Sequence, residues 1–159
     1  MTTVRDIVTE WMSETKEELI SSYDRQGLRA SGSYARSLEE VITERPNGFN
    51  LKMKAANHAY WMENGRGPNA VKSPEEAKRL YPIISQWVQD KRLGFDKGHI
   101  FAICLKIVYQ GIRVPNKYNP GGVVSDVVTE KRIDDLINKI GRNILGDFQS
   151  TVIKTLKDG

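Results

Sequence analysis

The segment EVITERPNGFNLKMKA, residues 40–55, carries the clearest signal for the fold. Apolar and polar side chains alternate over residues 49–55, which is the period-two pattern of a strand with one buried face. Residues 40–44 can form a partner strand, and the Pro-Asn-Gly sequence at 46–48 has the composition of a type I turn. Because two strands alone are marginal in water, the segment predicts an antiparallel hairpin that is covered by other elements.

An amphipathic helix is predicted before the hairpin. Residues 4–23 repeat apolar side chains at the spacing of one helical face. Thr3 can cap this helix, with Asp6 in the reciprocal position of a capping box. Gly27 is suited to end it.

The chain ends in the pattern of one long helix, for which Thr129 is a suitable cap. Roughly 27 residues would span about 40 Å, which is longer than the core of a small domain requires. Gly141 and Gly146 could bend or interrupt this helix. Its predicted apolar face consists of Ile133, Leu136, Ile137, Ile140, Ile144, Phe148, Val152 and Leu156.

Two further helices are predicted in the middle of the chain. Ser73 followed by Pro74 is a strong start signal, but Pro82 interrupts the pattern, so a second helical stretch is expected from there to Gly94. Residues 98–109 are apolar almost all round, which predicts the central buried helix.

The predicted fold class is α+β, with a small antiparallel sheet packed by an N-terminal amphipathic helix, a central apolar helix and a long C-terminal helix. The length suits a single domain over residues 1–159. Residues 116–122, which contain Asn-Pro-Gly-Gly, are predicted to be a flexible loop.

Composition restricts the function more than it reveals it. Cys104, the single cysteine, lies in an apolar run and is expected to be a buried, inert thiol. The net charge of +4 is only mildly basic, but residues 97–125 contain no Asp or Glu. Such a surface could face phosphate or an acidic protein, or could be an ordinary solvated surface. No segment is long and apolar enough to predict a membrane span, so a soluble intracellular protein is expected.

A search for catalytic and metal-binding patterns finds little. The two histidines, His58 and His99, stand in no recognisable triad, and with one cysteine they do not make a zinc site. Glu63 is an acid in an unusual setting, beside Trp61 and a Gly-rich turn. It could act in catalysis with His58, or it could accept hydrogen bonds from the turn amides that follow it. We expect a protein that is not an enzyme and holds no cofactor.

The order of several motifs resembles the family of bacteriophage neck, head–tail joining and tail-completion proteins. The sequence SGSYARSL at 31–38 precedes the hairpin, and an aromatic segment then closes in Glu-x-Gly-x-Gly-Pro at 63–68. An apolar helix follows, ending in Gly-Ile-Arg at 111–113, and a Pro-Gly loop leads to the terminal helix. The resemblance covers residues 30–124, and residues 70–95 are a predicted helical insertion relative to compact members.

This resemblance implies a structural virion protein, made in the cytoplasm of the host bacterium, that forms a homo-oligomeric ring at the head–tail junction. Its partners would be other copies, adjacent portal, connector or tail proteins, and DNA contacted non-specifically in the channel. The segment at 57–65, capped by Asn57 as a short helix or formed as a strand and turn, could supply a subunit contact, although its aromatic residues, Trp61 above all, could instead fill the core. The interface candidates are Tyr60, Trp61, Met62, Glu63, Arg66, Arg113 and Lys117. The alternative is a small basic nucleic-acid-binding module.

Overall fold

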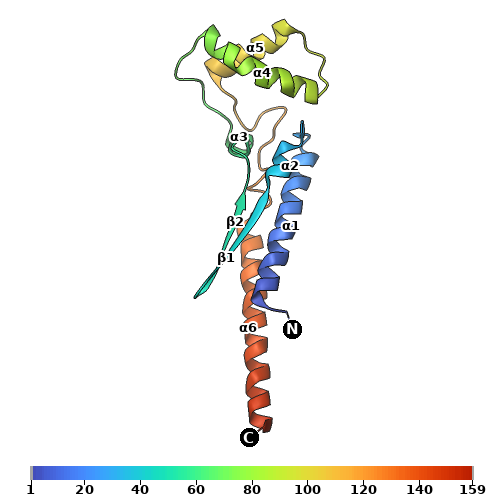
Figure 1. The fold of residues 1–159 in the computed structure, drawn as a ribbon, viewed down its shortest axis with the longest axis vertical. Helices are drawn as coiled ribbons and strands as arrows, with labels where there is room; N and C mark the ends of the chain where they lie inside the picture. Colours follow the sequence, from blue (N-terminus) through green and yellow to red (C-terminus); the bar gives the residue numbers. More distant parts are fainter. Residues whose placement is uncertain (1, 159) are drawn as a thin grey trace.

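The computed structural model describes residues 2–158 as an elongated molecule, with a pair of helices at one end and a projecting helix at the other (Figure 1). Its elements are α1 (Val4–Arg25), α2 (Ser33–Ser37), β1 (Glu39–Arg45), β2 (Gly48–Lys54), α3 (His58–Asn64), α4 (Pro74–Asp90), α5 (Lys97–Gln110) and α6 (Glu130–Asp158). The fold class is α+β, as predicted from the sequence.

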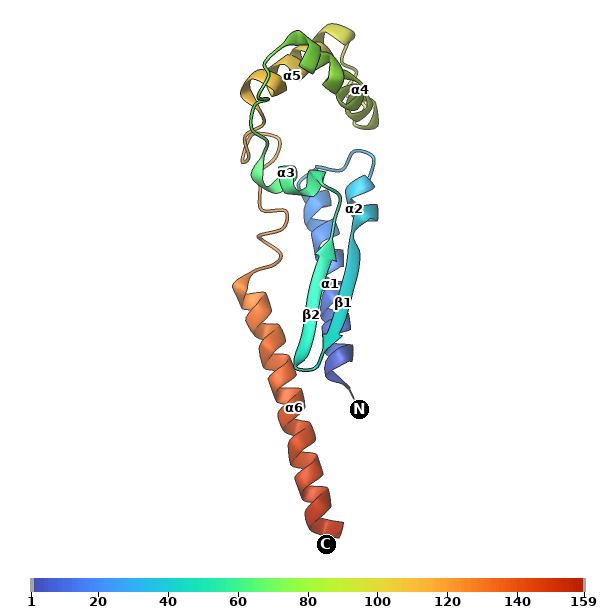
Figure 2. The same cartoon turned by 60° about the vertical axis from the view of Figure 1, so that its left-hand side comes forward.

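The predicted hairpin is confirmed and forms the middle of the molecule. β1 pairs with β2 in antiparallel register, with Ile42 opposite Leu51. α1 packs against both strands and against α6, and Figure 2 shows the hairpin in front of α1, with α6 running alongside. Ile7, Val8 and Leu136 form the buried core of this part. We call α1, α2, the hairpin and the first half of α6 the body.

The helix ends follow the capping signals in the sequence. Thr3 and Asp6 form the reciprocal capping box of α1, and Gly27 follows its last turn with φ of +66°. Ser73 accepts a hydrogen bond from the amide of Glu76 at the start of α4. The hydroxyl of Thr129 accepts one from the amide of Arg132 at the start of α6. These helices begin where short-range hydrogen bonds satisfy their first free amides.

A second cluster of buried side chains closes the upper end of the body. The rings of Tyr23 and Tyr34 lie 4.8 Å apart, and Leu38 and Val123 pack with them. Val123 belongs to the segment that returns from α5 towards α6, so this cluster fixes that segment to the body.

The position of α5 differs from the sequence-based expectation of a central helix against the sheet. α5 packs on α4, and the buried cluster that they share consists of Ala77, Val88, Ile100, Cys104 and Val108. This pairing buries one face of α5. Apolar side chains on its other faces stay partly exposed, for example Tyr109 at 45%. We call α4 and α5 the helical pair. Cys104 is buried as predicted, and burial raises the pKa of its thiol.

Pro82 does not divide α4 into two helices, contrary to the prediction. The helix runs from Pro74 through Pro82 to Asp90. Proline inside a helix removes one backbone hydrogen bond and costs roughly 3 kcal/mol. Packing of Ala77 and Val88 against α5, on either side of the proline, offsets this cost.

α6 is one continuous helix, so Gly141 and Gly146 do not interrupt it. Leu136 is buried against the body, but Phe148 is 66% exposed and Leu156 is 77% exposed. No helix within residues 2–158 combines the length and hydrophobicity needed to cross a membrane.

Candidate interaction site

The chain passes twice between the body and the helical pair, and the two passes meet in a region that we call the joint, residues 57–69 and 111–125. The amide of Arg66 donates to the carbonyl of Ile112 (2.7 Å), and the amide of Ile112 donates back to Arg66 (2.6 Å). This antiparallel bridge joins the Glu-x-Gly-x-Gly-Pro and Gly-Ile-Arg motifs. Two motifs more than 40 residues apart in the sequence are therefore one structural feature.

Two glycines make this bridge possible. Gly65 has φ 75° and ψ −172°, and Gly111 has φ 73° and ψ −164°, a backbone conformation that is essentially restricted to glycine. A Cβ at Gly65 would overlap the carbonyl oxygen of Ile112, and one at Gly111 would overlap that of Arg66. Both glycines are therefore required by backbone conformation and by the close approach of the two passes.

Glu63 holds the second pass of the chain in place. Its carboxylate accepts hydrogen bonds from the amides of Val124 (2.9 Å) and Ser125 (3.2 Å). Partial burial acts to raise the pKa of Glu63, but hydrogen bonds from the Ser125 side chain and neighbouring amides outweigh it, so the pKa lies below its ordinary value. The expectation that Glu63 would bind the turn amides immediately after it was wrong. The amides come from a segment about 60 residues further along the chain.

Asparagine side chains organise the predicted loop at 116–122, which contains neither helix nor strand. The Asn116 carboxamide oxygen accepts from the amide of Tyr118 (2.8 Å). The Asn119 side chain donates to the carbonyl of Met62 (2.8 Å) and accepts from the amide of Gly121 (2.9 Å). The loop is therefore attached directly to α3.

The aromatic side chains of the joint are exposed. Tyr60 is 68% exposed and Trp61 is 49% exposed, whereas Met62 packs against the upper cluster of the body. The expectation that Trp61 fills the core was wrong, because Met62 is the residue that faces the buried cluster and adjacent side chains of a helix point in different directions. Asn57 occupies the N-cap position of the predicted short helix, but its side chain makes no capping hydrogen bond.

Basic side chains surround these aromatic residues. The Arg66 guanidinium lies 6.0 Å from the centre of the Trp61 ring, within the range of a cation–π contact. Lys117 lies 5.6 Å from the ring of Tyr118, which is 80% exposed, and Arg113 is exposed beside the bridge. All seven interface candidates thus belong to the joint.

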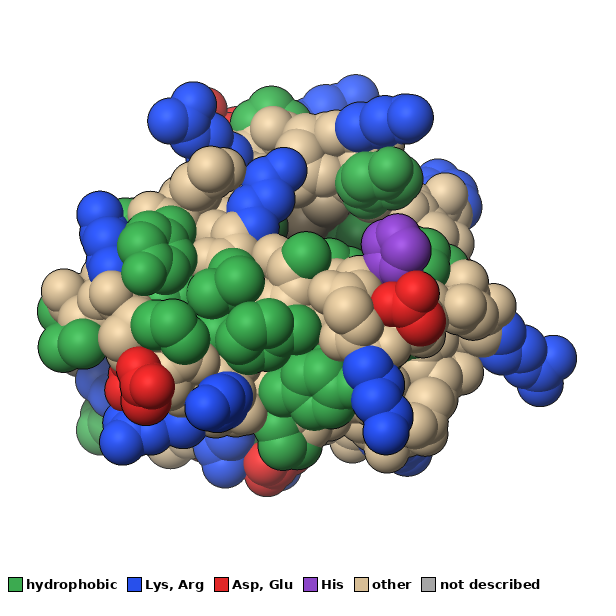
Figure 3. All heavy atoms as spheres, turned by 90° about the horizontal axis from the view of Figure 1, so that it is seen from above, with side chains coloured by type: hydrophobic (Ala, Val, Ile, Leu, Met, Phe, Trp, Pro, Cys, Tyr) green, Lys and Arg blue, Asp and Glu red, His purple; other side chains and the backbone are tan. Residues whose placement is uncertain are grey.

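Charge is divided unevenly along the molecule. Residues 65–125, which include the helical pair, contain ten Lys and Arg against four Asp and Glu, whereas the rest of the chain contains fourteen against sixteen. Seen from the end formed by the helical pair, apolar side chains lie together and basic side chains border them (Figure 3). This end can therefore attract anions or an acidic protein surface.

The other candidate residues take structural positions. The ring of His58 lies edge-on to Tyr34, with 6.3 Å between centroids. The Tyr34 hydroxyl is buried without a hydrogen-bond partner, and burial followed by the nearby charge of Glu63 raises its pKa to about 12. His99 contacts Asp96, the N-cap residue of α5. Across residues 2–158, no three His, Cys, Asp or Glu side chains lie close enough together to hold a metal ion.

The sequence did not identify Asn119, Val124 or Ser125 as parts of this site. Asn119 was visible only as one residue of a loop motif, and Val124 and Ser125 contribute backbone amides, which leave no sequence signal. Comparisons with models of protein families, with curated proteins and with solved structures find no match to this chain.

Proposed function

We propose that the protein is a structural virion subunit of a tailed bacteriophage, a neck or tail-completion protein whose copies form a ring at the head–tail junction. The observation that carries this proposal is the exposure of aromatic side chains at the joint, Tyr60, Trp61 and Tyr118. Aromatic residues with neighbouring arginine are enriched at protein interfaces.

The motif order that resembles the phage family supports the proposal in a second way. The Glu-x-Gly and Gly-x-Arg motifs are the parts of the chain that build the joint, through Glu63, Gly65 and Gly111. They hold α3 and the loop at 116–122 in a fixed relation to each other. A rigid, exposed, aromatic surface is suited to repeated contact between subunits, and copies related by rotation can close into a ring. The proposed role involves no reaction and no cofactor.

The role can be tested in the phage itself. A phage that lacks this protein should accumulate filled heads and free tails that do not join, as seen by electron microscopy, and mass spectrometry should find the protein in intact virions. The substitution Trp61→Ser should reproduce the defect in joining, whereas Ile83→Ser, which removes a similarly exposed apolar side chain from α4 (65% exposed), serves as the control. Normal particles formed without the protein would refute the proposal.

The excess of basic residues over 65–125 favours a second candidate function, a nucleic-acid-binding module. Binding through these residues would weaken steeply as salt increases, because each phosphate contact releases counterions. Fluorescence anisotropy with a labelled DNA duplex measures this dependence. If no binding occurs even at low salt, this candidate is eliminated.

A further inference from the structure

The exposed side of α1 is acidic. Residues 6–24 carry six Asp and Glu but a single basic residue, Lys16. Glu10, Glu14 and Glu17 follow each other at the four- and three-residue spacing of one helical face, and all three are exposed. We call this side of the helix the acidic face of α1.

Pairing within the chain leaves part of this charge unused. Of the six acids, Asp6 serves in the capping box of α1, and three form ion pairs. Lys16 is already paired with Glu40 of the hairpin (3.6 Å). In the part of the chain that the structure describes, Glu14 and Glu17 therefore remain without an ion pair.

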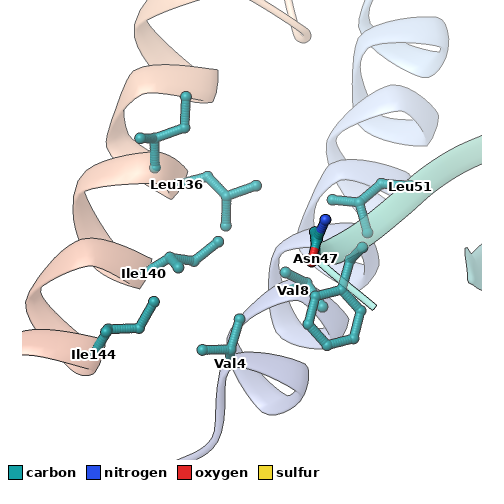
Figure 4. Close-up of a pocket in the computed structure, with 10 residues that line it drawn as sticks. Val4, Val8, Asn47, Leu51, Leu136, Ile140 and Ile144 are labelled. Carbon is teal, nitrogen blue, oxygen red and sulfur yellow. The ribbon is translucent and has the colours of Figure 1, made fainter. Parts of the chain in front are cut away.

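The apolar side of α1 is used inside the molecule. Val8 is 1% exposed, and Figure 4 shows Val4 and Val8 on the side of α1 that faces Ile140 of α6. The hairpin packs on α1 as well. The acidic face is thus the side of α1 that is left for a partner.

The joint has the opposite chemistry. It contains three Lys and Arg against one acid, Glu63, and the carboxylate of Glu63 is already held by two backbone amides. Arg113 and Lys117 are exposed, and neither forms an ion pair among the described residues. The exposed side chains of Trp61 and Tyr118 add an indole N–H and a hydroxyl, which also donate hydrogen bonds. The joint therefore presents donors and positive charge where α1 presents acceptors and negative charge.

The two surfaces lie on different sides of α1, so they do not meet within one chain. Met62 of α3 packs against the cluster that contains Leu19 and Tyr23, which places α3 on the buried side of α1. Glu17 lies two residues before Leu19, about 200° away around the helix. In Figures 1 and 2, α3 lies to the left of the upper end of α1. Copies set side by side can bring the joint of one towards the acidic face of the next.

We propose that the joint of one copy packs on the acidic face of α1 of a second copy. The two exposed basic side chains of the joint then donate to Glu14 and Glu17, and the aromatic side chains beside them cover the helix. Because the two surfaces are different, the contact is heterologous and generates a ring when the rotation between copies closes. This inference deepens the proposed function by naming the subunit contact, and it rests on that function for the closed ring.

Reversal of charge in the full chain tests the contact. The helix variant carries Glu14→Lys and Glu17→Lys, and the joint variant carries Arg113→Glu and Lys117→Glu. Each variant alone brings like charges together, so its self-association should be at least about tenfold weaker than that of the wild type. Sedimentation over a range of concentrations measures this change.

The decisive measurement is made on a mixture of the two variants. An acidic joint then meets a basic helix at one contact, and a basic joint meets an acidic helix at the next. Association should therefore return in the mixture, although each variant associates poorly alone. A mixture that associates no better than its separate components would overturn the contact.

A matched control makes the same change of charge away from both surfaces. Lys52→Glu and Lys131→Glu replace two exposed lysines of the hairpin and of α6. This double variant should associate as the wild type does. If it loses association as much as the joint variant, the effect comes from net charge and the proposed contact is wrong.

Disulfide trapping detects the same contact when association is weak. One sample carries Glu14→Cys and the other Lys117→Cys, while the native Cys104 is fully buried and stays in place. Mild oxidation of the mixture should give a covalent dimer of twice the chain mass of 18.0 kDa. The control mixture, Glu14→Cys with Lys52→Cys, should give much less product. Equal product from the two mixtures argues against the contact, and so does a chain that neither associates nor is trapped at any concentration.

Nucleic acid is the other occupant that a basic, aromatic surface suits. If the joint variant loses affinity for labelled DNA but associates with itself as the wild type does, the joint binds nucleic acid and the contact between copies is excluded.

The failure of this inference can be distinguished from the failure of the proposed function. Phage whose virions contain the helix variant and join heads to tails normally would exclude the contact and leave the virion role standing. Association that is restored by mixing, in a protein that is absent from virions, would exclude the virion role and leave the contact standing.

Discussion

Substituting Gly111 by alanine should weaken the joint more than any other single methyl addition at a loop glycine. The backbone at Gly111 has φ 73° and ψ −164°, a conformation that costs other residues roughly 1–3 kcal/mol. The added Cβ would also lie 2.7 Å from the carbonyl carbon of Gly67 and 2.8 Å from the nitrogen of Pro68. The first pass of the chain must therefore move away.

That movement breaks the two hydrogen bonds between Arg66 and Ile112, at 2.6 and 2.7 Å. Each contributes about 1 kcal/mol net. Together with the conformational cost, Gly111→Ala should lower the free energy of unfolding by about 4 kcal/mol. For a chain of this length, that corresponds to a melting temperature roughly 10 °C lower.

Gly27→Ala is the matched control, because Gly27 also follows a helix with positive φ (+66°) but has no atom within 4 Å of its Cβ position. It should cost only about 1 kcal/mol. Thermal and urea unfolding, followed by far-ultraviolet circular dichroism and tryptophan fluorescence, measure both variants. If Gly111→Ala costs no more than Gly27→Ala, the bridge does not stabilise the fold and the reasoning fails.

Three further substitutions probe other parts of the structure. Glu63→Gln should cost about 2 kcal/mol at pH 7, since a hydrogen bond to a charged group contributes about 1.5–3 kcal/mol. Because the folded pKa of Glu63 lies below the ordinary value of 4.5, this stabilisation is present above pH 4.5 and is lost as the pH falls through the folded pKa. In urea unfolding, the difference in free energy of unfolding between wild type and Glu63→Gln should therefore be smaller at pH 3 than at pH 7. A difference that is the same at both pH values would contradict this role of Glu63. Tyr34→Phe removes a buried hydroxyl that has no partner and should leave the melting temperature unchanged or raise it, whereas a loss above about 1 kcal/mol would reveal a hydrogen bond. Pro82→Ala should stabilise the protein by roughly 1–3 kcal/mol by restoring a backbone donor inside α4, and a lower melting temperature would argue against a continuous helix there.

The features that could be predicted from the sequence depend on atoms that are near each other in the chain. The caps at Thr3, Ser73 and Thr129 each use an amide three residues further on. The hairpin is likewise specified by alternation within each strand and by its turn. In these places the sequence contains both partners of the interaction within a few residues, so the type of element follows from local chemistry.

Interactions between distant segments were not predictable in the same way. The role of Glu63 depends on amides 61 and 62 residues away, and a backbone amide is present whatever the side chain. The apolar pattern of α5 correctly indicated burial but could not identify α4, rather than the sheet, as its partner. For Pro82, local propensity predicted a break that packing against α5 overrides.

The amphipathic pattern of α6 predicts which face of the helix needs burial, but it does not show how much of that face the rest of the chain covers. Its apolar row is regular from Leu136 to Leu156, so the sequence predicts the same need for burial along the whole row. The body satisfies that need at Leu136 but ends near Asn143, and Leu156 remains 77% exposed. Fully burying a large aliphatic or aromatic side chain contributes roughly 1.5–3 kcal/mol, so covering the exposed side chains of Ile144, Phe148, Val152 and Leu156 would contribute several kcal/mol. An apolar helix face that the rest of the described chain does not cover favours association with another apolar surface.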